Sequence, residues 1–194
     1  MPELPEGAEG WFAVPSVDAL SEKYFPEVTT WTERRRQAIL LVNSKIADSR
    51  PFTFFCEEIV ASTPFQVPVH TTRALKLIAE TQPGGILIVA AQLGRSHRGR
   101  SIRLACKMFA ADEFGLGSLE VGSILLTHPE RLVDFLGLFM DCPGDEFAQD
   151  NGDDSSFGIP SYGFDIGGIE FHINDNDDTN GQYGPATGFL SSEV

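Results

Sequence analysis

A basic segment that contains glycines offers the clearest chemistry in this sequence. Residues 92–101 read QLGRSHRGRS and lie between an apolar run that predicts a strand and Ser101, which can cap a helix. A helix start presents unpaired backbone N–H groups, glycines let the backbone approach a ligand closely, and guanidinium groups donate forked hydrogen bonds to anions. The spacing fits neither a Walker A loop nor a GxGxxG fingerprint, so it indicates no particular nucleotide.

We therefore expect the basic turn, Arg95–Arg103, to bind an anion. The predicted ligand is a phosphate-bearing small molecule or the end of a nucleic acid. The residues assigned to this site are Gln92, Arg95, His97, Arg98, Gly99, Arg100 and Ser101. A binding module for an anionic ligand is the leading function hypothesis.

The acidic residues of the C-terminal third are alternative partners for these arginines. The formal net charge is -14, yet residues 1–131 carry 14 Lys and Arg against 15 acidic residues. Residues 132–194 carry 13 acidic residues and no Lys or Arg. Such a field disfavours nonspecific nucleic-acid binding, although a local basic patch can still hold one anion. The acidic third can therefore neutralise the chain's own arginines or bind a basic partner protein, and a structural or partner-binding role is a further alternative.

A catalytic site is the second hypothesis, and it depends on the fold. Three apolar runs, Ile86–Ala91, Leu119–Leu126 and Leu136–Asp141, are typical of strands covered on both faces. If these strands are parallel, the residues that follow them meet at one sheet edge, where open α/β sheets bind ligands. The candidate catalytic residues at this edge are His97, His128, Asp141 and Asp145. Imidazole and carboxyl groups suit acid–base chemistry, and carboxylates hold Mg²⁺ or Mn²⁺, so the alternative is a metal-dependent hydrolase or phosphoryl-transfer enzyme.

Other metal-binding patterns are weak. Asn174–Asp178 alternates oxygen-bearing side chains but lacks the glycine and glutamate spacing of an EF-hand, so we interpret it as an acidic surface loop. The three cysteines, Cys56, Cys106 and Cys142, contain no CxxC pair and predict neither a disulfide framework nor a structural zinc site. The sequence indicates no resident metal and no particular cofactor.

One helix is well marked by its sequence. Thr30 and Glu33 form a capping box, and apolar residues at helical spacing then predict a helix over residues 31–47. The triplet Arg34–Arg36 in its first turns is interpreted as a solvated face. Further helices are predicted over residues 72–81, from Ser101 to about Gly115, and from a second capping box at Thr127–Glu130.

Together these elements predict a single α/β domain over residues 1–194. We expect three layers: a mainly parallel or mixed central sheet, flanking helices, and a C-terminal β-hairpin that turns at Gly167-Gly168. Residues 1–15 are expected to form an extended N-terminal arm. Residues 132–194 are the acidic C-terminal third.

Several segments resemble those of a bacterial protein family that has no known activity. They are LPEGAEGWFA (residues 4–13), HRGRS (97–101), EFGLG (113–117), LLTHPERL (125–132) and GDEF (144–147). The resemblance implies a bacterial, cytoplasmic protein and carries over no catalytic residue. The opening MPELPE resembles the start of formamidopyrimidine-DNA glycosylases, but the chain lacks their C-terminal zinc-finger cysteines. No apolar run approaches the length of a membrane span, so we expect no membrane partner.

Overall fold

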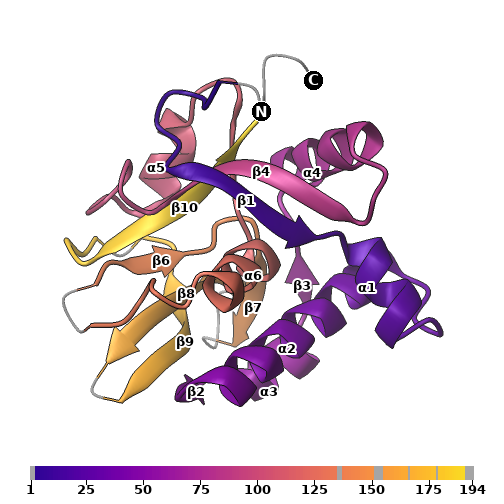
Figure 1. Ribbon diagram of the computed structural model, residues 1–194. Helices are drawn as coiled ribbons and strands as arrows, with labels where there is room; N and C mark the ends of the chain where they lie inside the picture. Colours follow the sequence, from indigo (N-terminus) through magenta and orange to yellow (C-terminus); the bar gives the residue numbers. More distant parts are fainter. Residues whose placement is uncertain (1–2, 135–136, 151–154, 166, 178, 191–194) are drawn as a thin grey trace.

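A mixed β-sheet with helices packed against it organises the described part of the chain (Figure 1). The computed structural model describes residues 3–134, 137–150, 155–165, 167–177 and 179–190. The helices are α1 Val17–Tyr24, α2 Trp31–Ser49, α3 Glu57–Ser62, α4 Val69–Thr81, α5 Ile102–Met108 and α6 Ser118–Thr127. The strands are β1 Gly10–Pro15, β2 Phe52–Phe54, β3 Phe65–Gln66, β4 Ile86–Leu93, β5 Glu113–Gly115, β6 Phe139–Asp141, β7 Glu146–Asp150, β8 Ser155–Asp165, β9 Gly168–Asp175 and β10 Tyr183–Phe189. The predicted α/β class is confirmed.

Two groups of strands meet at β10. The strand order is β1-β4-β10-β6-β8-β7-β3, with β5 beside β10 and with β9 paired to both β8 and β2. Among the described strands, only β10 with β6 and β2 with β9 pair in parallel, and the other pairs are antiparallel. The sequence predicted a mainly parallel or a mixed sheet. The sheet is mixed, and most of its strand pairs are antiparallel. The three-layer arrangement stays a prediction.

Helix α6 corrects the most consequential sequence prediction. Residues 119–126, predicted as a strand, form this helix, and residues 118–125 are all buried. A helix that is covered on all sides has no polar face, so its sequence is a continuous apolar run that periodicity cannot distinguish from a buried strand. The segment Thr127–Glu130 was predicted to begin a helix, but Thr127 is the last residue of α6 and His128–Glu130 follow that helix.

Segments at the two ends of the chain contribute strands that their sequence pattern does not reveal. The predicted N-terminal arm contains β1, which pairs with β4 from Gly10↔Ala91 to Pro15↔Ile86. Strand β10 lies between β4 and β6, although its sequence, YGPATGF, contains the glycines and proline that strands disfavour. Hydrogen-bonded neighbours on both sides override that local preference. Strand β7 likewise lies within residues 145–156, which lack a strand pattern.

Other local predictions are confirmed. Helix α2 begins where predicted, because Thr30 Oγ1 accepts a hydrogen bond from Glu33 N at 3.3 Å. Helix α4 covers the predicted residues 72–81, and β4 covers the first predicted strand. Strands β8 and β9 form the predicted hairpin, with Asp165 paired to Gly168, while Ile166 lies outside the described residues. In the part of the chain that the structure describes, no helix combines the length and apolar character needed to cross a bilayer.

Candidate functional site

The basic turn runs from the end of β4 across the first residues of β10. Gly99 N donates to Tyr183 O at 2.8 Å, so the turn continues the hydrogen bonding of β4 along β10. Gly94 has a positive φ of 96°, and a Cβ there would overlap the backbone of Gly184. Only glycine fits this crossing without strain. Ser101 then caps α5, because its Oγ accepts from Leu104 N at 3.3 Å.

Two residues of the predicted anion site are used inside the protein. Gln92 is fully buried, and its Nε2 donates to Pro185 O and Thr187 Oγ1, both at 2.8 Å. His97 is 6% exposed, and its Nε2 lies 2.7 Å from Glu113 Oε1. These side chains hold the turn against β10 and β5.

The contacts of His97 also define the roles of its ring nitrogens. Arg100 lies on the other side of the ring, with its NH1 3.1 Å from His97 Nδ1. A guanidinium can only donate, so Nδ1 accepts and Nε2 carries the proton that bonds to Glu113. Burial raises the pKa of Glu113, but hydrogen bonds from His97, Thr187 and Ala110 N outweigh this effect and hold it below its usual value. Both nitrogens of His97 are occupied, which leaves no free lone pair for a general base.

The acidic third supplies partners for two other arginines of the basic turn. Arg103 Nε forms an ion pair with Asp177 Oδ1 at 2.8 Å. Arg98 Nε donates to the carbonyl oxygen of Gly181 at 2.6 Å. Arg100 bonds within the turn, to Ser96 O and to His97. The alternative that these arginines engage the chain's own C-terminal third is therefore realised at Arg103 and, through a backbone oxygen, at Arg98.

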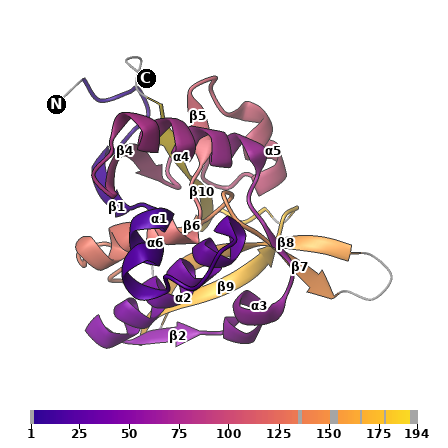
Figure 2. The same ribbon diagram turned by 90° about the vertical axis from the view of Figure 1, so that its right-hand side faces the viewer.

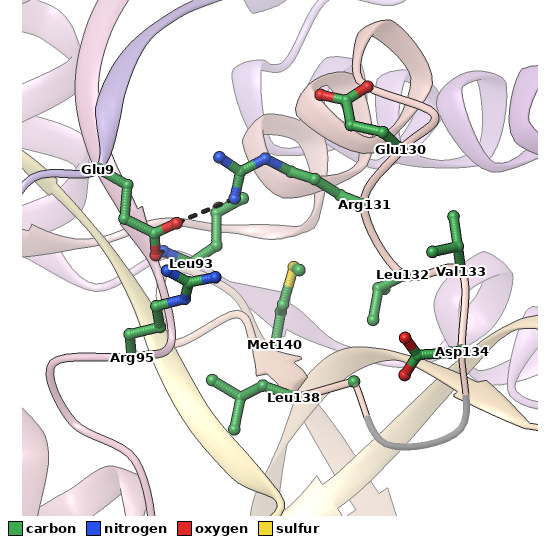
Figure 3. A pocket seen from close by; sticks show the side chains of 11 residues that line it. Glu9, Leu93, Arg95, Glu130, Arg131, Leu132, Val133, Asp134, Leu138 and Met140 are labelled. Atoms are coloured by element: carbon green, nitrogen blue, oxygen red, sulfur yellow. Dashed lines mark hydrogen bonds and ion pairs between the residues drawn. The ribbon is translucent and has the colours of Figure 1, made fainter.

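Arg95 is the exception among these arginines. Its side chain is exposed and forms no hydrogen bond or ion pair with the described residues, and it lines a cavity of about 510 Å³. Figure 3 shows Arg95 and Arg131 on the side of Glu9, with Asp134 on the opposite side. The cavity is lined by Glu9, Leu93, Arg95, Glu130, Arg131, Leu132, Val133, Asp134, Gly137, Leu138 and Met140. Its volume is in the range of small-molecule sites.

A fixed ion pair forms one wall of this cavity. Arg131 NH1 lies 3.0 Å from Glu9 Oε2, and the other Glu9 oxygen accepts from Leu93 N at 2.8 Å. The Arg131 guanidinium also lies over the Phe12 ring, 5.2 Å from its centroid. This wall thus holds two arginines and one carboxylate, and that carboxylate is bonded to Arg131 and to Leu93 N. The wall keeps an excess of hydrogen-bond donors, because the second guanidinium is unpaired.

The loop beside this wall has an unusual backbone conformation. Leu132 has a φ of 51°, the positive-φ non-glycine residue among those described. Arg50 holds the segment before it by donating to the carbonyl oxygens of Leu125, Pro129 and Arg131. Strained backbone of this kind persists where the surrounding structure enforces it and is frequent at binding sites. The same contacts hold the backbone at Arg131, and the ion pair with Glu9 holds its side chain.

The four predicted catalytic residues contact different partners and do not form one edge. His97 contacts Glu113, Asp145 contacts Arg35, and His128 contacts Glu130 at 3.1 Å beside the Phe12 ring. The predicted edge required residues 119–126 to be a strand parallel to β4 and β6, and this requirement was wrong because they form α6. Asp141, on β6, is buried, and burial raises the pKa of its carboxyl to about 7 against a smaller opposing effect of the Asn174 hydrogen bond.

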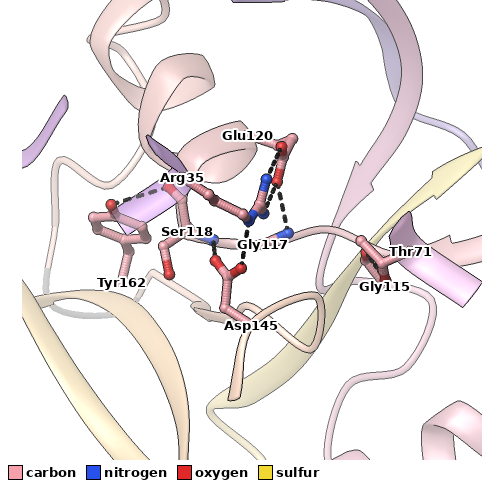
Figure 4. Close-up of polar contacts among 8 residues, drawn as sticks. All are labelled: Arg35, Thr71, Gly115, Gly117, Ser118, Glu120, Asp145 and Tyr162. Carbon is pink, nitrogen blue, oxygen red and sulfur yellow. Dashed lines mark hydrogen bonds and ion pairs between the residues drawn. The ribbon is translucent and has the colours of Figure 1, made fainter. Parts of the chain in front are cut away.

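Asp145 belongs to a buried network of ion pairs (Figure 4). Arg35 is fully buried and bonds to Asp145 Oδ1 at 2.7 Å and to both carboxylate oxygens of Glu120, at 2.8 and 2.7 Å. Ser118 N donates to Asp145 at 2.5 Å, and Gly117 N donates to Glu120 at 3.0 Å. The network joins α2, the start of α6 and the turn between β6 and β7.

The triplet Arg34–Arg36 is therefore not the solvated face that the sequence suggested. Arg35 and Arg36 are 0% and 8% exposed, and Arg34 Nε donates to Val28 O at 2.7 Å. The spacing of these residues contains the missed signal, because Arg35 precedes Ile39, Val42 and Ile46 by about one, two and three helical turns. Arg35 thus lies on the apolar stripe of α2, where a charged side chain requires partners.

Arg35 is one cation between two buried carboxylates, and the pKa values of Glu120 and Asp145 shift in opposite directions. Burial acts to raise the pKa of Glu120, but the charge of Arg35 and its hydrogen bonds lower it below the usual value. Burial raises the pKa of Asp145, and the nearby charge of Glu120 adds to this effect although Arg35 opposes it. The guanidinium of Arg35 has a raised pKa, because the two carboxylates outweigh its burial. The network connects three segments of the chain through buried side chains, which is a structural role.

The chain matches no family model, and no curated protein and no solved structure is significantly similar to it. The resemblance to a bacterial family stays a prediction.

Proposed function

We propose that the protein binds a small anionic ligand in the cavity of Figure 3, with Arg95 as the main anchoring residue and Arg131 beside it. The observation that carries this proposal is the contrast within the basic turn. Arg98, Arg100 and Arg103 have protein partners, whereas Arg95 presents its guanidinium to a cavity with no partner among the described residues. A phosphate or carboxylate group would receive two parallel hydrogen bonds from this guanidinium.

The other residues that line the cavity indicate which class of ligand it would bind. Glu130 and Asp134 add carboxylates to the cavity, while Leu93, Leu138 and Met140 add apolar surface. A ligand that also carries hydroxyl or ammonium groups would suit this acidic side of the cavity, and its carbon skeleton would cover the apolar residues. A polynucleotide is disfavoured, because its other phosphates would meet these carboxylates and the net charge of -14.

Isothermal titration calorimetry tests this proposal. Inorganic phosphate, a sugar phosphate, a nucleoside monophosphate, a phosphorylated amino acid and a short oligonucleotide would be titrated into the wild-type protein at low salt. We expect a small phosphorylated compound to bind, and Arg95→Ala to reduce its affinity at least tenfold. Arg98→Ala is the matched control, because it removes an exposed arginine three residues away that donates to a backbone carbonyl.

The control also separates this proposal from the wider site predicted by the sequence. Equal losses in Arg95→Ala and Arg98→Ala would favour an anion site spread over the whole basic turn. Wild-type protein that binds none of these compounds would contradict both versions. Arg131→Lys keeps the positive charge but removes the forked donors of the guanidinium. Loss of binding in this variant would show that hydrogen-bond geometry matters beyond charge.

A further inference from the structure

Asp141 is a buried acid whose environment supplies no cation. Along β6, Met140 is paired with Tyr162, whereas Asp141 is paired with Ser161 and so points to the other face of the sheet. Asp141 is 2% exposed, and its Oδ1 has no hydrogen-bond partner among the described residues. A buried carboxylate oxygen without a partner costs more than most folded proteins tolerate, so a missing partner is indicated.

A polar cavity of about 310 Å³ lies against this carboxyl group. Its other polar walls come from the end of β9 and the loop before β10, and they include Asn174, Asp175, Thr179, Asn180 and Tyr183. These side chains offer carboxylate, amide and hydroxyl oxygens. The orientation of Asn174 is fixed, because its Nδ2 donates to Ser161 Oγ at 2.9 Å.

The charge balance of this cavity is negative. Two acidic residues line it, the buried Asp141 and the exposed Asp175, whose Oδ1 accepts from Asp177 N at 3.1 Å, and its described lining contains no lysine, arginine or histidine. The arginines that reach the same loop are engaged elsewhere, since Arg103 pairs with Asp177 and Arg98 donates to Gly181 O. No protein cation is thus available to Asp141 from these neighbours.

We propose that this cavity is a site for a divalent metal ion of the oxygen-preferring class, with the buried Asp141 as its main charged ligand and Asp175, through the oxygen that does not accept from Asp177 N, as the second. Such ions take carboxylate, amide and hydroxyl oxygens together with water, and they approach an oxygen to 2.0–2.6 Å, closer than a hydrogen-bond donor does. Ca²⁺ fits better than Mg²⁺, because neutral oxygens outnumber carboxylates and the flexible coordination of Ca²⁺ suits an irregular loop. With two charged ligands, the affinity expected is that of weak sites, about 10⁻⁴ to 10⁻³ M.

Terbium luminescence is a direct test, because Tyr183 lines the same cavity and can transfer excitation to a bound Tb³⁺ ion. Titration of Tb³⁺ into the wild-type protein should produce luminescence excited through tyrosine, and millimolar Ca²⁺ should reverse it. Asp141→Asn should lower Tb³⁺ affinity at least tenfold while the protein stays folded, since the new side chain has nearly the same shape. Tyr183→Phe should lose most of the luminescence, because it removes the tyrosine that lines the cavity.

The matched control is Asp48→Asn, which removes one carboxylate from an exposed ion pair with Lys45 on α2. It changes the net charge as Asp141→Asn does, so it should leave the specific signal unchanged. Equal Tb³⁺ and Ca²⁺ responses in wild type and Asp141→Asn would overturn the proposal. It would also be overturned if methylammonium raised the thermal stability of the wild type while Ca²⁺, Mg²⁺ and Mn²⁺ did not, because the site would then hold an organic cation.

Discussion

Two arginines of this protein, Arg35 and Arg95, are used in opposite ways. Arg35 is fully buried and donates to Glu120 and Asp145 through its Nε and both terminal nitrogens. Arg95 is exposed at a cavity and has no partner among the described residues. An arginine whose three guanidinium nitrogens all donate to protein carboxylates holds elements together. An arginine whose donors remain unmatched beside a cavity is available to a ligand.

The comparison of Arg35 with Arg95 also separates a loss of folding stability from a loss of ligand affinity. Loss of Arg35 would leave two buried carboxylates with no cation, and this cost falls on the folded state. Loss of Arg95 would leave no buried group unpaired, so its cost should appear in binding. Four measurements follow from this difference, in order of decreasing expected effect on stability.

Arg35→Met should lower the free energy of unfolding by about 3 to 5 kcal/mol, because the apolar replacement leaves Glu120 and Asp145 uncompensated. Urea denaturation followed by circular dichroism measures this change. Arg34→Met is the matched control on the same helix, with an exposed ion pair to Asp18 and one backbone hydrogen bond, and it should cost about 1 kcal/mol. If the two variants lost similar free energies of unfolding, the buried network of Figure 4 would make Arg35 no more important for stability than Arg34.

Asp141 is a buried charge without a protein counterion and should give stability a pH dependence. Its folded pKa of about 7 lies above the unfolded value of 3.8, so the folded state binds the proton more tightly between these values. In EDTA, stability should therefore fall as pH rises from about 4 to about 7, by up to about 4 kcal/mol. Asp141→Asn should remove that decline and be more stable than wild type at pH 8. Denaturation midpoints that decline with pH equally in both proteins would contradict this assignment.

Tyr162→Phe tests the neutral part of the buried region around Arg35. The Tyr162 hydroxyl donates to Asn43 Oδ1 at 2.6 Å and also lies 3.2 Å from Ser118 O. Removal of the hydroxyl leaves buried acceptors unsatisfied, so we expect a loss of about 1 to 3 kcal/mol by chemical denaturation. Tyr24→Phe, at an exposed position, should change stability by less than about 0.5 kcal/mol. If Tyr162→Phe were as stable as wild type, only the charged residues of this buried region would contribute to stability.

Arg95→Ala should have the smallest effect on folding. Its exposed side chain has no partner to lose, so the free energy of unfolding should stay within about 0.5 kcal/mol of wild type. The same variant should lose the ligand-dependent increase in thermal stability that wild type shows with a small phosphorylated compound. A large loss of stability without ligand would place Arg95 in the same structural class as Arg35.

Local sequence predicted the elements that carry local signals. Thr30 and Glu33 marked the start of α2, Ser101 marked the start of α5, and Gly167-Gly168 marked the β8–β9 hairpin. In each case, the cap or turn residues lie within a few positions of the element that they define. The apolar run of α6 carried no such signal, because a helix buried on all sides and a buried strand have the same composition.

The candidate site was predicted only in outline. The sequence placed a basic turn between β4 and α5, but it treated the arginines of that turn as equivalent. Their roles depend on Asp177 and Gly181, which lie far away in the chain. Arg131 and the cavity beside it could not be inferred, because the wall that they form requires β1 and the segment after α6 to be neighbours in space.

The sequence by itself determined the α/β class, the starts of α2 and α5, the hairpin and the position of the basic turn. Only the tertiary structure decided which arginines have partners, since Arg35 and Asp145 are 110 residues apart and meet through the packing of α2 on α6. It also placed β10 at the centre of the sheet, despite its glycines and proline. The physical reason is the same in both cases. Caps, turns and periodicity act over a few residues, whereas burial and ion pairing are properties of groups brought together from the whole chain.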